Sequence, residues 1–193
     1  MIPSRLLLAT LATGLLSSFG GWASDVDSAV LSNCVTAGPI AFRWELDGEM
    51  IEFQVEAVAD NPQGTWLGIG FTDGSTTVRM APSNVVISGF VGSEAFSSSY
   101  ELTQRSSSGV NPSGPDVELI SASVGEDGVM RVRGRRELAS WPADGSSAMI
   151  WATGPVDGDV EAPNVMYHGT SHAPGGTTAT VVLAAAQNTC TEG

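Results

Sequence analysis

The chain contains only two histidines, His168 and His172, and their side chains are the first candidates for chemistry. They lie four residues apart in the glycine-rich segment Tyr167–Thr177, which precedes the last apolar run of the sequence. Imidazole groups at this spacing can bind a metal ion or transfer protons. A metal site would need further ligands from elsewhere, because no acidic residue or cysteine is close in sequence. The alternative is a surface loop in which both histidines only form hydrogen bonds.

The sequence shows none of the common catalytic motifs. It has no glycine-rich phosphate loop, no nucleophile elbow and no pair of histidines in an HExxH pattern. Serine and aspartate are plentiful, but their spacing does not indicate a catalytic triad. We therefore expect a protein that is not an enzyme.

The first residues have the pattern of a secretory signal peptide. Arg5 is followed by the short apolar run 6–16, and small residues lead to Ala23. Such a run is too short to span a bilayer, and the small residues are typical of a cleavage site. We expect residues 1–23 to be the signal peptide, residues 24–193 to be one domain without a transmembrane segment, and the mature protein to be periplasmic or secreted.

Two cysteines, Cys34 and Cys190, lie near the two ends of the expected mature chain. In an exported protein such a pair predicts a disulfide. Closing a loop of this size would stabilise the fold by about 5 kcal/mol in the chain-entropy model.

The chain is acidic, with a formal net charge of −13, eight basic residues and 21 acidic ones. It has no lysine, and the only basic cluster is the run from Arg131 to Arg136. This charge makes nucleic acid an improbable partner and suits either a solvated surface or docking to a basic protein.

The mature sequence predicts short strands separated by turn residues about every eight to twelve positions. This spacing is typical of a sandwich or barrel. In the segment 50–59 apolar and polar residues alternate, as in a half-buried strand. The same alternation predicts that Arg131, Arg133 and Arg135 share one face of a strand. The strands expected are 40–46, 50–59, 66–71, 85–91, 117–124, 129–135, 148–153 and 177–186. We expect a long surface loop at 97–114, a turn at 157–159 and a short helical turn at 136–141.

Several segments, in this order, resemble the signature of DOMON domains. They are the strand Trp66–Phe71, the run Met80–Gly89, the strand Ile150–Gly154, and the loop that contains Tyr167–Gly169 and Gly176–Thr177. Each motif is weakly specific, but their order and spacing together are more so. The resemblance covers most of the mature chain and implies an immunoglobulin-like antiparallel β-sandwich.

Some DOMON domains, such as the cytochrome domain of cellobiose dehydrogenase, bind b-type haem between one methionine and one histidine. By position the resemblance makes Met80 and His168 the axial ligands, with His172 as the alternative histidine. This ligand pair closes both axial positions of the iron, which suits electron transfer. The haem would be non-covalent, because the chain has no Cys-x-x-Cys-His motif. Four aromatic side chains are expected to form the wall of the haem site: Trp66, Phe71, Phe90 and Trp151.

The expected partner is a separate redox protein, with a membrane cytochrome as one candidate. The rival prediction is a haem-free module that binds carbohydrate or docks a partner. In that case exposed aromatic side chains would stack on a sugar ring, and Tyr100, Trp141 and Tyr167 are the first candidates.

Overall fold

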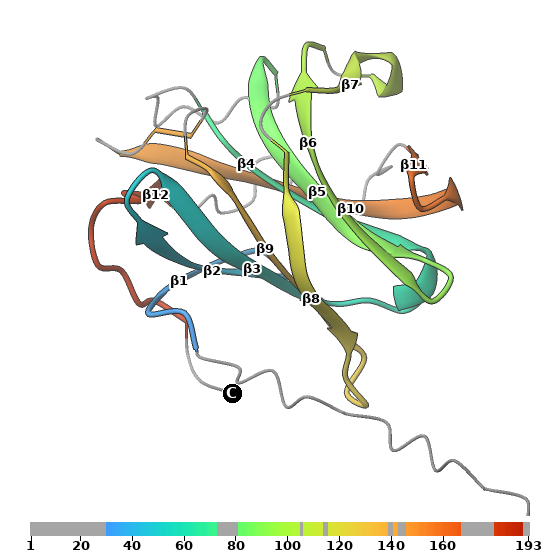
Figure 1. The fold of residues 1–193 in the computed structure, drawn as a ribbon, viewed down its shortest axis with the longest axis horizontal. Coiled ribbons are helices and arrows are strands. Elements are labelled where there is room, and N and C mark those ends of the chain that lie inside the picture. The colour runs from blue at the N-terminus through green and yellow to red at the C-terminus, as the bar shows by residue number, and fades with distance from the viewer. Residues whose placement is uncertain are drawn as a thin grey trace, which may run out of the picture.

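The computed structural model describes residues 30–72, 81–104, 106–113, 116–138, 141–142, 146–166 and 180–190, and these residues form two antiparallel β-sheets. The sheets pack on each other as a sandwich (Figure 1). The five-stranded sheet has the order β1–β2–β3–β9–β8. Its strands are β1 (Asn33–Ala37), β2 (Ile40–Asp47), β3 (Met50–Val58), β9 (Val129–Glu137) and β8 (Glu118–Val124). The predicted all-β sandwich is confirmed.

The second, seven-stranded sheet has the order β11–β10–β4–β5–β6–β7, and β12 also pairs with β10. Its strands are β4 (Thr65–Phe71), β5 (Ser83–Val91), β6 (Glu94–Leu102), β7 (Val110–Pro112), β10 (Ser147–Asp159), β11 (Ala162–Val165) and β12 (Thr180–Val181). Two short 3-10 helices, η1 (Pro62–Gly64) and η2 (Ser107–Gly109), complete the fold. Within the described ranges, no helix has the length and apolar character needed to cross a membrane.

Period-two alternation explains how the five-stranded sheet folds. Along β3 the side chains of Ile51, Phe53 and Val55 are fully buried against the other sheet. The intervening residues of β3 face outward together with the polar residues of β2 and β9. The apolar face is thus removed from water while the polar face stays hydrated, which is the main driving force for the sandwich.

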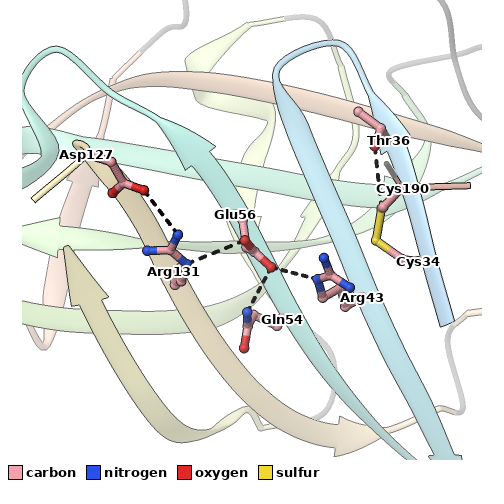
Figure 2. A network of polar contacts seen from close by, with 8 residues as sticks. All are labelled: Cys34, Thr36, Arg43, Gln54, Glu56, Asp127, Arg131 and Cys190. Carbon is pink, nitrogen blue, oxygen red and sulfur yellow. Dashed lines mark hydrogen bonds and ion pairs between the residues drawn. A yellow bond between two sulfur atoms is a disulfide. The ribbon is translucent and has the colours of Figure 1, made fainter. Parts of the chain in front are cut away.

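A polar network covers the outer face of this sheet (Figure 2). The Glu56 carboxylate accepts hydrogen bonds from Arg43 Nε and Gln54 Nε2, both at 2.9 Å, and also faces Arg131. The neighbouring pairs Arg133–Glu52 and Arg135–Asp47 extend the network along β9. The prediction that Arg131, Arg133 and Arg135 share one face is therefore confirmed.

The predicted disulfide between Cys34 and Cys190 is present, with 5.5 Å between the Cα atoms (Figure 2). Cys34 lies in the edge strand β1, and Cys190 lies in the C-terminal residues that run beside it. The bond thus joins the beginning of the described fold to its end.

One end of the sandwich interior is filled by five aromatic rings. The Trp141 ring contacts the rings of Phe71, Phe42 and Phe53, with ring centroids 4.9 to 6.1 Å apart. Phe42 also stacks on Trp44 at 5.2 Å. The Trp141 indole N–H donates to the backbone oxygen of Asn84 at 3.3 Å. This cluster joins both sheets near the place where β4 ends and β5 begins.

The guanidinium of Arg136 is buried beside this cluster. Its Nη1 donates to Ser99 Oγ at 2.9 Å, and its Cζ lies 4.7 Å from the centre of the Trp141 ring. Desolvation by burial lowers the pKa of Arg136 to about 10, so the side chain still carries its charge at neutral pH. Arg136 therefore connects β9 to β6 across the interior by charge, hydrogen bonding and ring stacking.

We predict that Arg136→Ala lowers the free energy of unfolding by about 3 kcal/mol, because it removes buried packing and leaves polar partners unsatisfied. Arg131→Ala, at an exposed ion pair, should cost about 1 kcal/mol or less. Urea unfolding of the two variants measures the difference. Equal losses would show that the buried guanidinium does not hold the interior together.

Two sequence predictions about loops are wrong. The segment 97–114 was expected to be a surface loop, but β6 and β7 occupy much of it. The apolar and polar residues of β6 do not alternate, because serines occupy buried positions. Ser97 and Ser99 point into the sandwich interior, whereas Phe96 and Tyr100 lie on the outer face of the seven-stranded sheet. The predicted turn at 157–159 belongs to β10, which pairs with β11 up to Asp159.

Two further predictions differ in their boundaries. The expected helical turn at 136–141 is strand up to Glu137. Among its described residues, a backbone hydrogen bond from Trp141 N to Leu138 O follows the strand. The closing strand expected at 177–186 is reduced to β12 among the residues that the structure describes. The remaining predicted strands are confirmed to within two residues at their ends, except that β10 continues to Asp159, six residues beyond the expected end at 153.

Candidate functional site

The seven-stranded sheet is apolar on both faces. Its inner face, with Ile69, Phe71 and Met149, packs on the five-stranded sheet. Its outer face carries a second cluster of buried apolar side chains, and no further sheet packs on that side in the described ranges. We call this second cluster the outer apolar face. Its members are Trp66, Val85, Ile87, Phe96, Tyr100, Ile150, Ala152 and Val156.

Strand register arranges these residues in rows across β10, β4, β5 and β6. One row contains Ile150, Gly70, Val85 and Tyr100, and the next has Ala152, Gly68 and Ile87. A third row contains Gly154, Trp66, Gly89 and Phe96. The small residues Gly68, Gly70 and Ala152 form a central strip of the sheet, and the Trp66 ring and the Val85 side chain lie over its two glycines.

The outer apolar face is covered. Its members are only 2–6% exposed, although a bare sheet face would be far more accessible to water. Burial of large apolar groups on both sides of an antiparallel sheet is unusual, since one side normally faces solvent. A large apolar ligand could therefore bind here only between this face and the part of the chain that covers it.

Trp66 lies flat on this face because two glycines make room for it. A Cβ atom at Gly154 would lie 2.9 Å from the Trp66 ring, and one at Gly68 would lie 3.0 Å from it. The indole N–H donates to the backbone oxygen of Met166 at 3.1 Å. Trp66 thus fixes the point where the chain leaves β11 and enters the segment that contains both histidines.

Tyr100 contributes the phenol of the outer apolar face. The ring is buried beside Val85, and no hydrogen bond to the hydroxyl is found among the described residues. Burial raises the pKa of Tyr100, so the hydroxyl stays protonated at neutral pH. It can therefore donate a hydrogen bond to an anionic group at the edge of this face.

The predicted site residues fall into three groups. Met80, His168 and His172 lie outside the described residues. Trp66 lies on the outer apolar face. Phe71, Phe90 and Trp151, the remaining expected wall residues, point into the sandwich interior.

Alternation along the strands explains this division. Trp151 lies between two residues of the outer apolar face, Ile150 and Ala152, so it must point to the other side of the sheet. The structure therefore does not bring the four expected wall residues together on one face.

The expectation of exposed aromatic residues is wrong for Tyr100 and Trp141, which are 6% and 3% exposed. Tyr100 packs on the outer apolar face and Trp141 in the interior. The third candidate for sugar stacking, Tyr167, lies outside the described residues.

Most of the outer apolar face was missed from the sequence. A usable signal was present, because Gly68 and Gly70 share the parity of Trp66 and therefore its face. Phe96 lies on another strand, so its place in the third row follows only from the pairing of β4, β5 and β6. Among the described residues, no three histidine, cysteine or acidic side chains come together to hold a metal ion.

The fold places the chain among two-sheet antiparallel β-sandwiches. In particular, it is structurally similar to the cytochrome domain of Myriococcum thermophilum cellobiose dehydrogenase, with 15% sequence identity and a TM-score of 0.54. The similarity covers 77% of this chain and 75% of that chain, and it confirms the predicted fold resemblance. No family model and no curated protein matches the sequence.

Proposed function

We propose that this protein is an exported electron-transfer domain that holds one b-type haem on its outer apolar face. In this proposal Met80 and His168 are the axial ligands, with His172 as the alternative to His168. The observation that carries the proposal is that the described residues flanking both segments that contain these candidates lie at the border of the outer apolar face. The fold similarity to a cytochrome domain supports the same function.

The first segment has both described ends at one side of this face. The second has one described end at each side, because Thr180, which follows it, pairs with Ala148 beside Thr72. Thr72 and Ala81 flank the first segment, beside the row of Gly70 and Val85. Met166 precedes the second, next to Trp66. Each segment therefore starts at the rim of the same apolar surface, which favours a ligand held between them.

The chain is long enough for both ligands to approach one iron. Ser83 follows the first segment, and Gly89 pairs with Trp66, which contacts Met166. Ser83 and Gly89 are six positions apart on β5, which corresponds to about 20 Å. Met80 lies three residues before Ser83, and His168 lies two after Met166, so an extended chain reaches about 10 Å and 7 Å from these points. These reaches add up to most of the span, so neither residue is too far away for both to bind one iron.

The described residues fit the porphyrin in shape and chemistry. The Trp66 ring, which lies over Gly68, and Phe96 provide aromatic contacts for a planar ring, with the small Ala152 beside them. Bound haem would supply one-electron chemistry at its iron. The protein would bind and orient it, exclude water from its faces and keep both axial positions closed.

We predict that Tyr100→Phe accelerates loss of haem on the order of tenfold, because it removes a donor to a carboxylate of the cofactor while preserving the ring. Transfer of haem to an excess of an acceptor protein measures the rate. Thermal unfolding of the haem-free variant should match the parent. An unchanged rate would show that the hydroxyl does not contact the cofactor.

Titration of the haem-free protein with haem tests the proposed function. We expect uptake that saturates at one haem per chain and quenches tryptophan fluorescence, since Trp66 would lie against the ring. Uptake without saturation, or none at all, would refute the proposal.

Export rests on the predicted signal peptide, residues 1–23, and agrees with the disulfide. We infer a periplasmic or secreted protein that exchanges electrons with a separate redox protein. Secretion of a full-length fusion and N-terminal sequencing of the secreted product would test the cleavage near Ala23.

A further inference from the structure

The C-terminal residues 182–190, which we call the C-terminal strap, occupy the free edge of β1. The backbone N–H of Cys34 donates to Gln187 O at 2.7 Å, and the N–H of Thr189 donates to Cys34 O at 2.8 Å. A parallel bridge joins Cys34 to Asn188. The strap thus satisfies the backbone groups of an edge strand that would otherwise be open to another strand.

The other contacts between the strap and β1 are polar. The Gln187 N–H donates to Asn33 Oδ1 at 2.9 Å, and Thr36 Oγ1 lies 3.5 Å from Cys190 Sγ (Figure 2). Within the strap, Val182 N donates to Gln187 Oε1 at 3.1 Å. Such hydrogen bonds, made at the surface, compete with water and contribute little to holding a segment in place.

Apolar anchoring of the strap ends at Leu183. This side chain is buried in the interior, and its backbone oxygen accepts a hydrogen bond from the Trp44 indole at 3.0 Å. The next three residues, Ala184, Ala185 and Ala186, are exposed, as are Asn188 and Thr189. Beyond Leu183 the strap therefore lacks the buried apolar contacts that resist local opening.

We propose that the Cys34–Cys190 disulfide is a redox-sensitive latch: its reduction releases residues 184–190 and opens the edge of β1, while the rest of the sandwich stays folded. Cys34 is fully buried and Cys190 is half-buried, so Cys190 is the more accessible sulfur. A thiol attacks Cys190 Sγ and Cys34 leaves as the thiolate. A second thiol then frees Cys190, so two thiols are oxidised to one disulfide and two cysteines are formed.

The rest of the sandwich should stay folded when the disulfide is reduced. The pairing of β1 with β2, the burial of Val35 and Ala37, and the bond from Trp44 to Leu183 do not involve the strap beyond Leu183. The latch is therefore local, and it does not depend on the proposed function.

Limited digestion with elastase, which cleaves after small residues, tests the latch at Ala184–Ala186. We expect reduction to accelerate cleavage in this run at least about tenfold, because the exposed segment can then detach from β1. Mass spectrometry should show loss of the C-terminal residues from an otherwise intact chain. The double variant Cys34→Ser/Cys190→Ser should be cleaved at the fast rate with or without reductant.

Far-UV circular dichroism under the same reducing conditions shows whether the sandwich persists. Unchanged cleavage after reduction would overturn the proposal, since polar contacts alone would then hold the strap. Loss of the β-sheet spectrum with cleavage throughout the chain would also overturn it, since the disulfide would then be a global staple. If the double variant does not fold, reduced parent protein gives the same comparison.

Discussion

Replacing Met80 or His168 with alanine is expected to abolish the six-coordinate, low-spin absorption spectrum of the haem-loaded protein. Each change would remove one axial ligand and leave an open position at the iron. Loss of residues that only orient a metal ligand typically weakens metal affinity 10- to 100-fold, so loss of the ligand itself should cost about 100-fold or more in haem affinity.

The matched control is His172→Ala, which removes the second histidine of the same segment and should leave the spectrum intact. If His172→Ala abolishes the spectrum and His168→Ala does not, the axial histidine is His172. If neither histidine variant changes it, ligation by this segment is refuted.

Ala152→Phe is expected to prevent haem uptake by filling the strip of small residues on the outer apolar face. Ala152 lies opposite Gly68 on the neighbouring strand, so a phenyl ring there would occupy the space proposed for the porphyrin. Overpacking of a buried position costs about 1–3 kcal/mol, which is less than most folded domains can lose without unfolding. Haem titration and thermal unfolding, measured together, separate binding from stability.

Ala41→Phe provides the control, because Ala41 lies on β2 and faces outward from the other sheet of the sandwich. The same change of residue at that position should leave haem uptake unaffected. Full uptake by Ala152→Phe would show that the haem does not lie on this strip. Equal loss in both variants would point to a general effect of the added ring.

The sequence predicted the fold wherever apolar and polar residues alternate clearly. In β3 the pattern from Ile51 to Glu56 is regular, and the strand forms as expected. Sequence reasoning failed for β6, where Ser97, Ser98 and Ser99 interrupt the pattern although two of them are buried. Serine can occupy such positions when a neighbouring group bonds to it, as Arg136 does to Ser99 and Ser88 does to Ser97. A sequence does not show these partners.

The candidate site was predicted only in part, for a related reason. Trp66 lies on the outer apolar face, but Phe71 and Trp151, which were grouped with it by residue type, point into the interior. Their faces depend on strand register, and register becomes visible only when β4 and β10 are paired. The partners of Trp66 on its own face, such as Ile87 and Phe96, come from strands that are distant in sequence.

The most direct test of the proposed function is the absorption spectrum of the one-to-one haem complex, recorded in the oxidised and reduced states. We predict a six-coordinate, low-spin haem in both states, because methionine and histidine would close the two axial positions throughout the redox cycle. A protein that remains colourless after exposure to haem, or a complex with an open axial position in both states, would contradict the account.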